Sequence, residues 1–392
     1  MKNIRFFVDK SQISEQMKLS ARLSYHIEKS LHYREIDKGY VLMSRAWHGG
    51  CCDGGVVDAD LNFVDHTGYS INRGCGYDFD STIAAKGSRC IFIGSFHTVY
   101  GHAITDALRK LWFLNTAEGQ QLIGDGYEIV YITTKDSKMP QWFLHILEMA
   151  TVNKKQFIHL HTTTRYDKII VPDDSLVCED NRILYTEVFR STIETIKERV
   201  RQTDIYKQVP EGGSYYFTRT GCNHIMREMG EPALEKEFKK QGFEIISPEQ
   251  LPFEHQVSLL MKCQRQASTE SSTSHAAIFC TPESEVIILR KADYENKYSM
   301  MIADFVGNKT VFIDANHSIK TNKSLPMLGP FYLFVTQNVR TFFNSKSGGV
   351  NICLHPSYWL YLWSKHKIVN FFLRLYDKLI RRGLGWRRVW LG

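Results

Sequence analysis

The stretch from Gly94 to Phe113 constrains the fold of this chain more than any other. It continues an apolar run with the character of a buried strand (residues 90–93), crosses a short polar loop and enters a segment with apolar side chains at helical spacing. Strand, loop and helix in this order are the repeating unit of a parallel sheet, and such sheets keep their ligands beyond the carboxyl ends of the strands. The chain is therefore expected to be an α/β protein with a site near residue 100.

Two titratable side chains begin that helix. His102 and Asp106 are four residues apart, so they stack on one face of a helix expected over residues 100–113, with Arg109 and Lys110 one turn later. A carboxylate can orient an imidazole and stabilise its protonated form, which suits the ring to act as a general base. Asp106 could itself be the base while His102 contacts substrate. The competing interpretation is an ordinary i,i+4 pair that only packs or caps the helix.

Strands and helices alternate along most of the chain. Strands are predicted at 127–132, 157–160, 168–172, 215–219, 242–246 and 286–289, and helices at 141–149, 181–202, 232–240 and from 253. Two such arrays joined by a helix predict two doubly wound Rossmann-like domains that face a cleft. Residues 39–77 indicate β hairpins, residues 1–35 show weak helical periodicity, and residues 308–350 look like loops. The predicted division is 1–180, a bridging helix at 181–203, 204–330, and a loop and tail at 331–392.

A second group of polar residues follows the later strands. Arg219 ends a strand, and its planar guanidinium matches the oxygens of a diphosphate; Arg227 could do the same or form an ion pair with Glu231. The run Glu270–Ser271–Ser272 ends another strand and opens a helix, where backbone N–H groups attract anions. Glu270 could hold sugar hydroxyls and His275 could face the phosphates. Surface ion pairing of the arginines and N-capping by Ser271 or Ser272 are the structural alternatives.

Three motifs in this order resemble the family 61 glycosyltransferases. The resemblance covers about Gly39 to Arg290, with Lys110, Gly230, Ser271 and Glu283 as departures where the family usually has Arg, Asn, Gly and Gly. The matching residues are Tyr100, Gly101, His102, Asp106, Leu111 and Trp112, then Arg219, Arg227 and Glu231, then Gln256, Glu270, Ser272, His275, Phe279 and Pro282.

The resemblance implies a GT-B fold and an inverting transferase, hexosyl or pentosyl, that takes a sugar from a nucleotide-diphosphate donor such as a UDP-sugar. It implies a lipid-linked bacterial surface glycan as acceptor, in capsule, O-antigen or lipopolysaccharide. His102 and Asp106 would be catalytic, and residues 1–180 would form the acceptor side and 204–330 the donor side. The donor would contact Arg219, Arg227, Glu270, Ser271, Ser272 and His275, and the acceptor His97, Tyr100 and Arg109.

No cofactor or metal ion is expected. Asp58–Ala59–Asp60 and Asp78–Phe79–Asp80 have the Asp-x-Asp form with which some transferases hold a divalent ion, but a turn between strands explains the first better. Neither a G-x-x-x-x-G-K-[ST] nor a G-x-G-x-x-G motif is present, which disfavours P-loop and dinucleotide chemistry. The alternative from another class is a non-catalytic, membrane-associated polysaccharide-binding or scaffold protein with a decayed transferase fold.

The basic charge of the chain is confined to its end. The net charge is +7, and residues 365–392 alone carry eight Lys or Arg against one Asp, so a nucleic-acid partner is not indicated. Four of the seven Trp also lie beyond residue 354, and an aromatic, basic, amphipathic helix suits an anionic membrane surface. The alternative is a helix that packs across the two domains. The proposed lipid-facing residues are Lys365, Lys367, Phe371, Phe372, Arg374, Lys378, Arg381, Arg382, Trp386, Arg387, Arg388 and Trp390.

The location is expected to be cytoplasmic and peripheral on the inner face of the cell membrane. Met1 to Lys10 has no apolar signal region, no run is long and apolar enough to span a bilayer, and nine cysteines without a C-x-x-C pair indicate reduced thiols.

Overall fold

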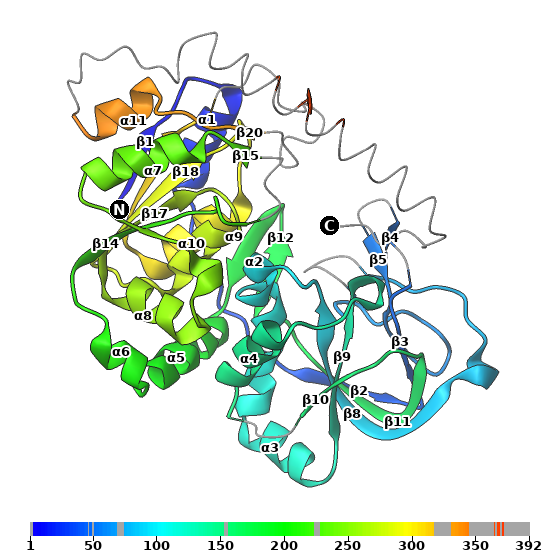
Figure 1. The fold of residues 1–392 in the computed structure, drawn as a ribbon. Coiled ribbons are helices and arrows are strands. Elements are labelled where there is room, and N and C mark those ends of the chain that lie inside the picture. Colours follow the sequence, from blue (N-terminus) through cyan, green and yellow to red (C-terminus); the bar gives the residue numbers. More distant parts are fainter. Residues whose placement is uncertain are drawn as a thin grey trace.

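The computed structural model describes residues 3–45, 47–48, 51–68, 74–152, 156–222, 228–316 and 331–344, together with residues 364, 367, 368 and 371. Two sheets form two halves of a mixed α/β protein (Figure 1). The proposed membrane residues Lys365, Phe372, Arg374, Lys378, Arg381, Arg382, Trp386, Arg387, Arg388 and Trp390 lie outside the described residues, as does Arg227.

The first sheet is mixed. Its order is β10-β9-β8-β11-β3-β6, and β2 also pairs with β11. Strands β8 to β11 run parallel, whereas β2, β3 and β6 are antiparallel to their neighbours. The bounds are β2 (Tyr33–Asp37), β3 (Tyr40–Leu42), β6 (Gly55–Val57), β8 (Ala85–Phe96), β9 (Glu128–Thr133), β10 (Phe157–His159) and β11 (Thr164–Pro172).

Helices of the first half cover one face of this sheet. They are α2 (Tyr100–Ala103), α3 (Ala117–Gly124) and α4 (Gln141–Met149), with 3₁₀ turns η2 (Asp106–Leu108) and η3 (Leu111–Asn115) between α2 and α3 (Figure 1). Side chains alternate along β8, so Ile91 and Ile93 pack beneath the helices while Cys90 and Phe92 face a separate core. That second core contains only strand and loop residues among those described. The first half is therefore not doubly wound in the described chain, contrary to the prediction.

The second sheet is parallel throughout, in the order β1-β19-β18-β17-β14-β16. Helices cover both faces: α7 and α11 enclose one core, and α8 and α10 the other. Its strands are β1 (Ile4–Phe7), β14 (Gly213–Phe217), β16 (Glu244–Ile246), β17 (Cys263–Thr269), β18 (Glu285–Arg290) and β19 (Lys309–Asp314). Its helices are α7 (Glu231–Lys240), α8 (Phe253–Lys262), α9 (Ser272–His275), α10 (Lys297–Val306) and α11 (Gln337–Phe342).

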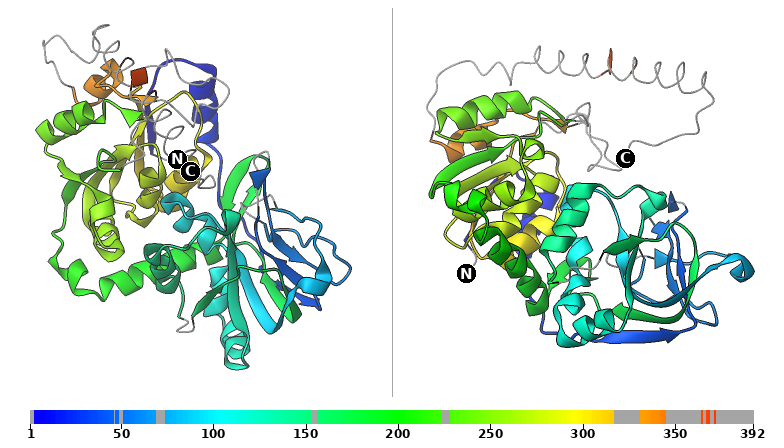
Figure 2. Two further views of the ribbon diagram at one scale, coloured as in Figure 1. Left: turned by 45° about the vertical axis from the view of Figure 1, so that its right-hand side comes forward. Right: turned by 60° about the horizontal axis from the view of Figure 1, so that its bottom comes forward.

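One apolar core is shared by the two halves. It runs from the helix-covered face of the first sheet to the facing helices of the second, and includes Ile91, Leu147 and Val257. Helix α5 (Glu187–Arg201) contacts η3 and α4 on one side and α8 on the other, burying Phe189, Ile193, Ile196 and Val200. Apolar packing thus holds the halves together, and Figure 2 shows the two halves from two further directions.

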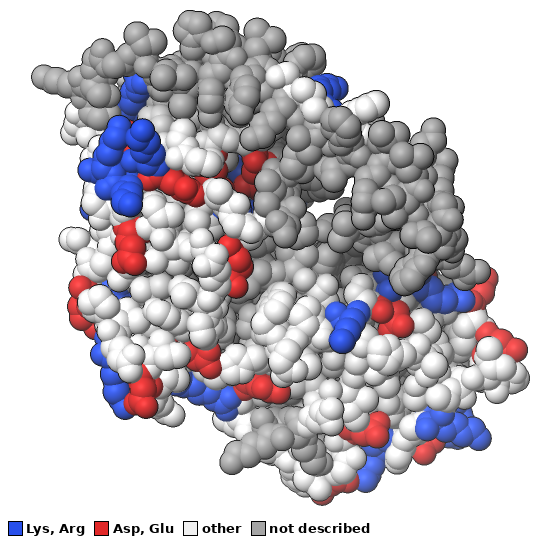
Figure 3. Space-filling view, in the orientation of Figure 1, with Lys and Arg blue, Asp and Glu red and all other residues white. Residues whose placement is uncertain are grey.

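Smaller elements complete the described fold. They are α1 (Gln12–Ser20), β4 (Trp47–His48), β5 (Cys51–Asp53), β7 (Gly74–Cys75), η1 (Ser81–Ile83), η4 (Thr134–Asp136), β12 (Leu176–Glu179), β13 (Arg182–Tyr185), α6 (Asp204–Gln208), β15 (Glu228–Met229), η6 (Pro248–Gln250), η7 (Ala276–Phe279) and β20 (Phe331–Tyr332). No described helix has both the length and the apolar composition needed to cross a membrane. Acidic and basic side chains are interspersed over the described part of the face in Figure 3.

Four predicted segments differ in the structure. Residues 4–7 form β1, which pairs with β19 in the second sheet although it begins the chain. The expected helix over 100–113 is broken, because Thr105 has φ −127° and ψ −88°. The expected helix over 181–202 starts only at Glu187, since Arg182–Tyr185 pairs with β12. Residues 309–314, expected to be a loop, are the buried strand β19. The division into domains at residue 180 is still a prediction.

Candidate active site

His102 and Asp106 meet as the sequence predicts, although the helix between them is interrupted. The Nδ1 atom of His102 lies 2.6 Å from Oδ2 of Asp106. The His102 side chain is 32% exposed and that of Asp106 is 9% exposed, so the imidazole reaches solvent while the carboxylate is buried behind it. This is the arrangement in which a carboxylate fixes the orientation of an imidazole.

Asp106 is also held by the other half of the molecule. The hydroxyl of Tyr298, in α10, donates a hydrogen bond to Oδ1 of Asp106. Both carboxylate oxygens therefore have partners, one from each half. Sequence reasoning did not find Tyr298, because nothing in the local pattern around residue 298 indicates a partner 192 residues away.

Two further histidines surround this pair. The ring of His97, in the loop after β8, stacks on His102 at 5.4 Å between centroids. The ring of His275, at the end of α9, lies 5.0 Å from the Tyr298 ring, and its Nε2 is 3.3 Å from the Asn296 amide nitrogen. Tyr100 opens α2 and lies 6.1 Å from the Trp142 ring. Of the acceptor residues that the sequence proposes, His97 therefore lies beside His102, whereas the Tyr100 ring lies beside Trp142.

The three imidazoles differ in protonation. Burial lowers the pKa of His102, but the charge and hydrogen bond of Asp106 outweigh burial and leave that pKa raised. Burial, followed by the charge of His102, lowers the pKa of both His97 and His275 to about 4. His97 and His275 are neutral at pH 7, and His102 is the ring most able to take up a proton.

Gly101 explains how the two halves approach each other here. A Cβ at this position would lie 2.7 Å from Nδ1 of His275 and 3.1 Å from Cα of Ser272. Any larger residue would push α2 away from α9, so glycine permits the contact that brings Tyr298 to Asp106. In the Tyr-Gly-His run of the sequence, the glycine thus permits close packing and the histidine is the candidate reactive group.

Cations and carboxylates gather at the carboxyl edge of the second sheet. Arg219 follows β14, and its Nε lies 3.6 Å from Oε1 of Glu228. Lys291 follows β18, and its Nζ lies 2.6 Å from the same oxygen. Burial lowers the pKa of Lys291, an effect that the charge of Glu228 opposes. Two cations thus share one carboxylate, which leaves positive charge available to an anionic ligand.

Glu270 directly follows β17 at the same edge and is fully buried. The charges of Arg290 and Lys291 and the nearby Ser299 hydroxyl favour its ionised form, yet neither carboxylate oxygen has a hydrogen-bond partner of good geometry among the residues that the structure describes. Burial raises the pKa of Glu270 to about 7. A buried carboxyl group without hydrogen bonds is costly, and such groups are concentrated at functional sites.

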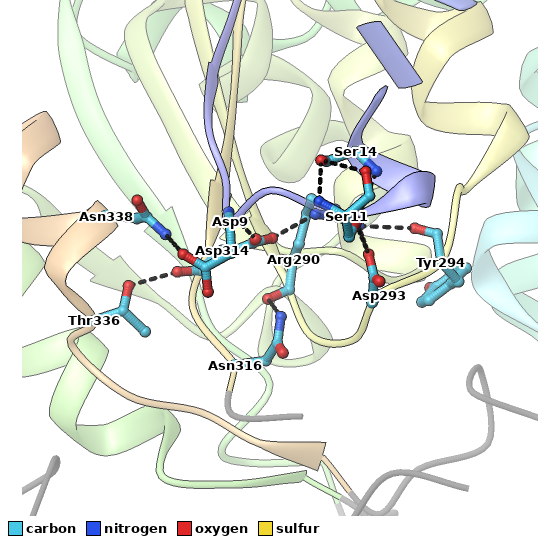
Figure 4. Close-up of polar contacts among 10 residues, drawn as sticks. All are labelled: Asp9, Ser11, Ser14, Arg290, Asp293, Tyr294, Asp314, Asn316, Thr336 and Asn338. Carbon is cyan, nitrogen blue, oxygen red and sulfur yellow. Dashed lines mark hydrogen bonds and ion pairs between the residues drawn. The ribbon is translucent and has the colours of Figure 1, made fainter. Parts of the chain in front are cut away.

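The neighbouring Arg290 is different, because it is tied into the fold (Figure 4). Its guanidinium contacts Asp314 at 2.5 Å and Asp293 at 3.2 Å, and Asp9 donates its backbone N–H to Asp314 at 2.7 Å. This network attaches the N-terminal segment to the carboxyl ends of β18 and β19. Arg290 is thus structural, whereas Arg219 and Lys291 are the candidates for ligand binding.

Other proposed site residues have structural partners. The Ser271 hydroxyl accepts from the N–H of Thr273 and caps α9, a helix of one turn, as the N-capping alternative predicts. Ser272 lies against Gly101. Arg109 is buried and contacts Asp174 at 3.0 Å, and so does Lys110 at 2.7 Å; the expectation that Arg109 lines the acceptor site is therefore not supported.

One departure from the motif pattern, Gly230, has a local reason. Gly230 has φ 96°, and a Cβ there would lie 2.1 Å from the carbonyl oxygen of Leu333, so the position requires glycine. Glu231 does not depend on Arg227 for its contacts: it accepts hydrogen bonds from the Tyr216 hydroxyl and the Arg219 N–H. Burial, then the charge of Glu228, raises the pKa of Glu231 to about 7.

The first Asp-x-Asp motif forms a turn. Oδ1 of Asp58 accepts from the backbone N–H groups of Asp60 and Asn62 at 2.9 and 2.8 Å. In the second motif, Asp80 caps the turn η1 through the N–H of Thr82. Both motifs therefore have local structural roles, and neither places two carboxylates beside the His102 site.

Comparison with known proteins indicates a class of enzyme. No curated protein matches the chain. The model of the family described as glycosyltransferase 61 matches residues 100–287, a span that contains His102, Asp106, Arg219 and Glu270 and ends just before Lys291 and Tyr298. This match supports a glycosyltransferase.

Proposed function

We propose that this protein is an inverting glycosyltransferase that transfers a sugar from a nucleotide-diphosphate donor, such as a UDP-sugar, to a lipid-linked bacterial surface glycan. The observation that carries the proposal is the buried Asp106, held by Tyr298 of the second half and presenting His102 toward solvent. The family match to residues 100–287 supports the reaction class. Donor, acceptor, inversion and the GT-B arrangement are parts of the proposal.

The chemical step follows from the His102–Asp106 pair. An acceptor hydroxyl attacks the anomeric carbon of the donor as the bond from that carbon to the diphosphate oxygen breaks. Because Asp106 engages Nδ1 of His102, Nε2 takes the hydroxyl proton. The buried carboxylate stabilises the imidazolium that forms. One displacement inverts the anomeric centre, so no covalent intermediate is needed.

The donor side would be the carboxyl edge of the second sheet. Arg219 and Lys291 supply positive charge for the departing diphosphate, and Glu270 supplies a carboxylate for a hydroxyl pair of the donor. With two cations present, transfer is expected without a divalent ion on the phosphates. His97 and Tyr100 would line the acceptor side.

A thermal-shift measurement with nucleotides tests the donor assignment. The full chain is heated with UDP, GDP, ADP and a panel of nucleotide sugars, without acceptor, and hydrolysis of each sugar is followed. A ligand at about 100 times its Kd stabilises by about 2.7 kcal/mol, so a rise of several degrees in Tm is expected for one nucleotide. No rise with any nucleotide would contradict the donor site. Binding without hydrolysis or transfer would instead support the scaffold alternative.

We also propose that the protein works in the cytoplasm on the inner face of the cell membrane, where a lipid-linked acceptor would be presented. Ile368 and Phe371 of the proposed tail are described and are 55% and 63% exposed. Each Lys or Arg near an anionic leaflet contributes about 1 kcal/mol of binding. Deletion of residues 365–392 is expected to abolish co-sedimentation with anionic liposomes while nucleotide binding is retained. Equal sedimentation of both proteins would place membrane binding elsewhere.

A further inference from the structure

Three side chains outside the proposed active site are arranged like metal ligands. Asp136 ends the turn η4 after β9, and His159 and His161 lie at the end of β10 and just beyond it. Strands β9 and β10 are parallel neighbours, so their carboxyl ends meet at one edge of the first sheet. One potential ligand atom from each of the three residues lies within 4.8 Å of the other two.

The distances among these atoms suit a small ion. Nδ1 of His161 lies 2.7 Å from Oδ1 of Asp136, and Nε2 of His159 lies 3.5 Å from the same oxygen. In a tetrahedral zinc site with bonds of about 2.0–2.1 Å, neighbouring donor atoms are about 3.3 Å apart. The two distances lie on either side of that value. An ion can therefore enter with small side-chain adjustments.

The backbone at Asp136 is held in an unfavourable conformation. Lys135 has φ 57° and Asp136 has φ 49°, two consecutive residues with side chains in the left-handed region. That region is tolerated by aspartate but costs free energy for lysine, and such strain is concentrated at functional sites. Here the strained turn directs the Asp136 carboxylate to the two histidines, a contact that a bound ion would stabilise.

The His159 ring is fixed in place. It stacks on Tyr131 with 5.0 Å between centroids and 6° between planes, and its side chain is only 11% exposed. The Thr133 hydroxyl donates its proton to the carbonyl of Ser137, so it can only accept from Nε2 of His159, 3.0 Å away. Ion binding requires the neutral ring to move this proton to Nδ1, which frees the Nε2 lone pair.

We propose that Asp136, His159 and His161 bind a divalent transition-metal ion of the zinc class, with a fourth position open to water. Two imidazoles favour zinc, copper or nickel over magnesium and calcium, which prefer oxygen ligands. The site lies on the first sheet, whereas the diphosphate is proposed to bind at the second. This inference therefore does not depend on the proposed function.

The ion would order the turn that carries Lys135. The Lys135 charge contributes to the lowered pKa of His97, which places this turn beside the proposed acceptor side. The Lys135 N–H also donates to the Ser44 hydroxyl, at 3.0 Å. A metal at Asp136 would thus connect the ends of β9 and β10 to the loop near His97.

Zinc binding to the full chain tests the proposal. The protein is stripped with EDTA, dialysed and titrated with ZnCl₂ by calorimetry and by competition with a chromogenic chelator, in parallel with His161→Ala and His159→Ala. His161 is 60% exposed, so its replacement leaves folding intact. His145→Ala is the matched control, because His145 lies 2.7 Å from Glu254 and 3.9 Å from Glu148. Wild type is expected to bind one zinc ion more than His161→Ala, or to bind that ion at least 100-fold more tightly.

Two further readouts separate this site from others. Saturating zinc is expected to raise the Tm of wild type and of His145→Ala by about 3 °C or more, and of His161→Ala by clearly less. Cobalt is expected to give the visible absorption of a tetrahedral ion in the same two proteins, and magnesium to give no binding heat. Equal zinc stoichiometry and affinity in wild type, His159→Ala and His161→Ala would overturn the proposal, including the case in which cysteines hold the ion.

Discussion

At the candidate site, the two halves of the molecule differ in how completely their charged side chains are paired. In the first half, Asp106 has a partner on both oxygens, and His102 is oriented by it. In the second half, Glu270 is buried with no hydrogen bond of good geometry to either oxygen among the described residues, and Arg219 and Lys291 share a single carboxylate. The first half thus holds a pair of side chains already oriented for proton transfer. The charged side chains of the second half lack a full set of partners, as in a site for a charged ligand. Preorganised hydrogen bonds are typical of a group that reacts, and charged side chains without a full set of partners are typical of a site that binds a ligand.

The contrast between the two halves depends first on whether His102 and Asp106 are catalytic. His102→Ala and Asp106→Asn are each expected to lower kcat by about two orders of magnitude or more, the range for lost general acid–base catalysis. Circular dichroism and Tm should remain near those of wild type for His102→Ala, because the imidazole is 32% exposed. Turnover with a nucleotide sugar and acceptor is the measurement.

His32→Ala is the control for that experiment, since His32 is an exposed histidine of the first half whose described hydrogen bond to Asp173 uses its backbone. It should retain wild-type turnover. Near-normal turnover in both His102→Ala and Asp106→Asn would remove the pair from the mechanism and return it to a packing role.

Glu270→Gln measures how much the buried Glu270 carboxylate lowers the free energy of unfolding. The folded pKa, about 7, lies above the unfolded value of about 4.5, so the carboxyl stabilises fully below pH 4.5 and its contribution is lost as pH rises through 7. Removing the charge should raise the free energy of unfolding by about 3 kcal/mol at pH 8 and by less than about 1 kcal/mol at pH 5. Denaturant titrations at the two pH values supply the test.

The same variant is expected to bind the donor less tightly, because an amide replaces the carboxylate proposed to hold donor hydroxyls. Greater stability with weaker binding is the usual trade-off at a functional site. A pH-independent change in stability would mean that Glu270 is not the group whose pKa is raised.

Arg219→Ala tests which half carries the diphosphate. Hydrogen bonds to charged groups contribute about 1.5–3 kcal/mol, so the Kd of a nucleoside diphosphate should rise about 10- to 100-fold. Acceptor binding should change less. The matched control is Arg265→Ala, whose guanidinium donates to Ser214 at 3.0 Å near the opposite end of the same sheet. Equal losses for donor and acceptor would move Arg219 out of the donor site.

The sequence predicts the second half better than the first, for physical reasons. Strands β14 and β18 are short buried apolar runs within regular alternation, and α7 begins beside a proline, so local pattern suffices. Strand β19 has the same character but is flanked by polar residues, and only its position between β1 and β18 shows that it is central.

Partners distant in sequence set the remaining differences. Asp174 pairs with both Arg109 and Lys110 in the interior, so Arg109, which the sequence proposes for the acceptor site, is a buried structural residue. The break at Thr105 that interrupts the predicted helix is stabilised by the threonine hydroxyl, which donates to the Gly101 carbonyl at 2.7 Å. The four-residue spacing nevertheless predicted correctly that His102 and Asp106 meet, because their side chains contact each other across the interrupted helix. The family-like motifs likewise marked Arg219 and Glu270, whereas Lys291 and Tyr298 lie beyond them.

Tyr298→Phe is expected to have the smallest effect and is the sharpest probe of how the halves cooperate. Loss of the hydroxyl removes one hydrogen bond to the Asp106 anion, worth about 1.5 kcal/mol, so kcat should fall about tenfold while KM for the donor stays the same. The His102 base works only when deprotonated, and its pKa is raised, so wild-type kcat/KM should fall as pH drops through a value above 6.5. Without the Tyr298 hydroxyl, Asp106 should raise the pKa of His102 further. The pH at which kcat/KM falls on the acid side of the profile, its acid limb, should therefore rise by less than about one unit. A residue that only packs the two halves together would lower stability without moving the limb. An unmoved limb together with unchanged kcat would therefore show that the second half contributes to donor binding but not to the proton-transfer pair.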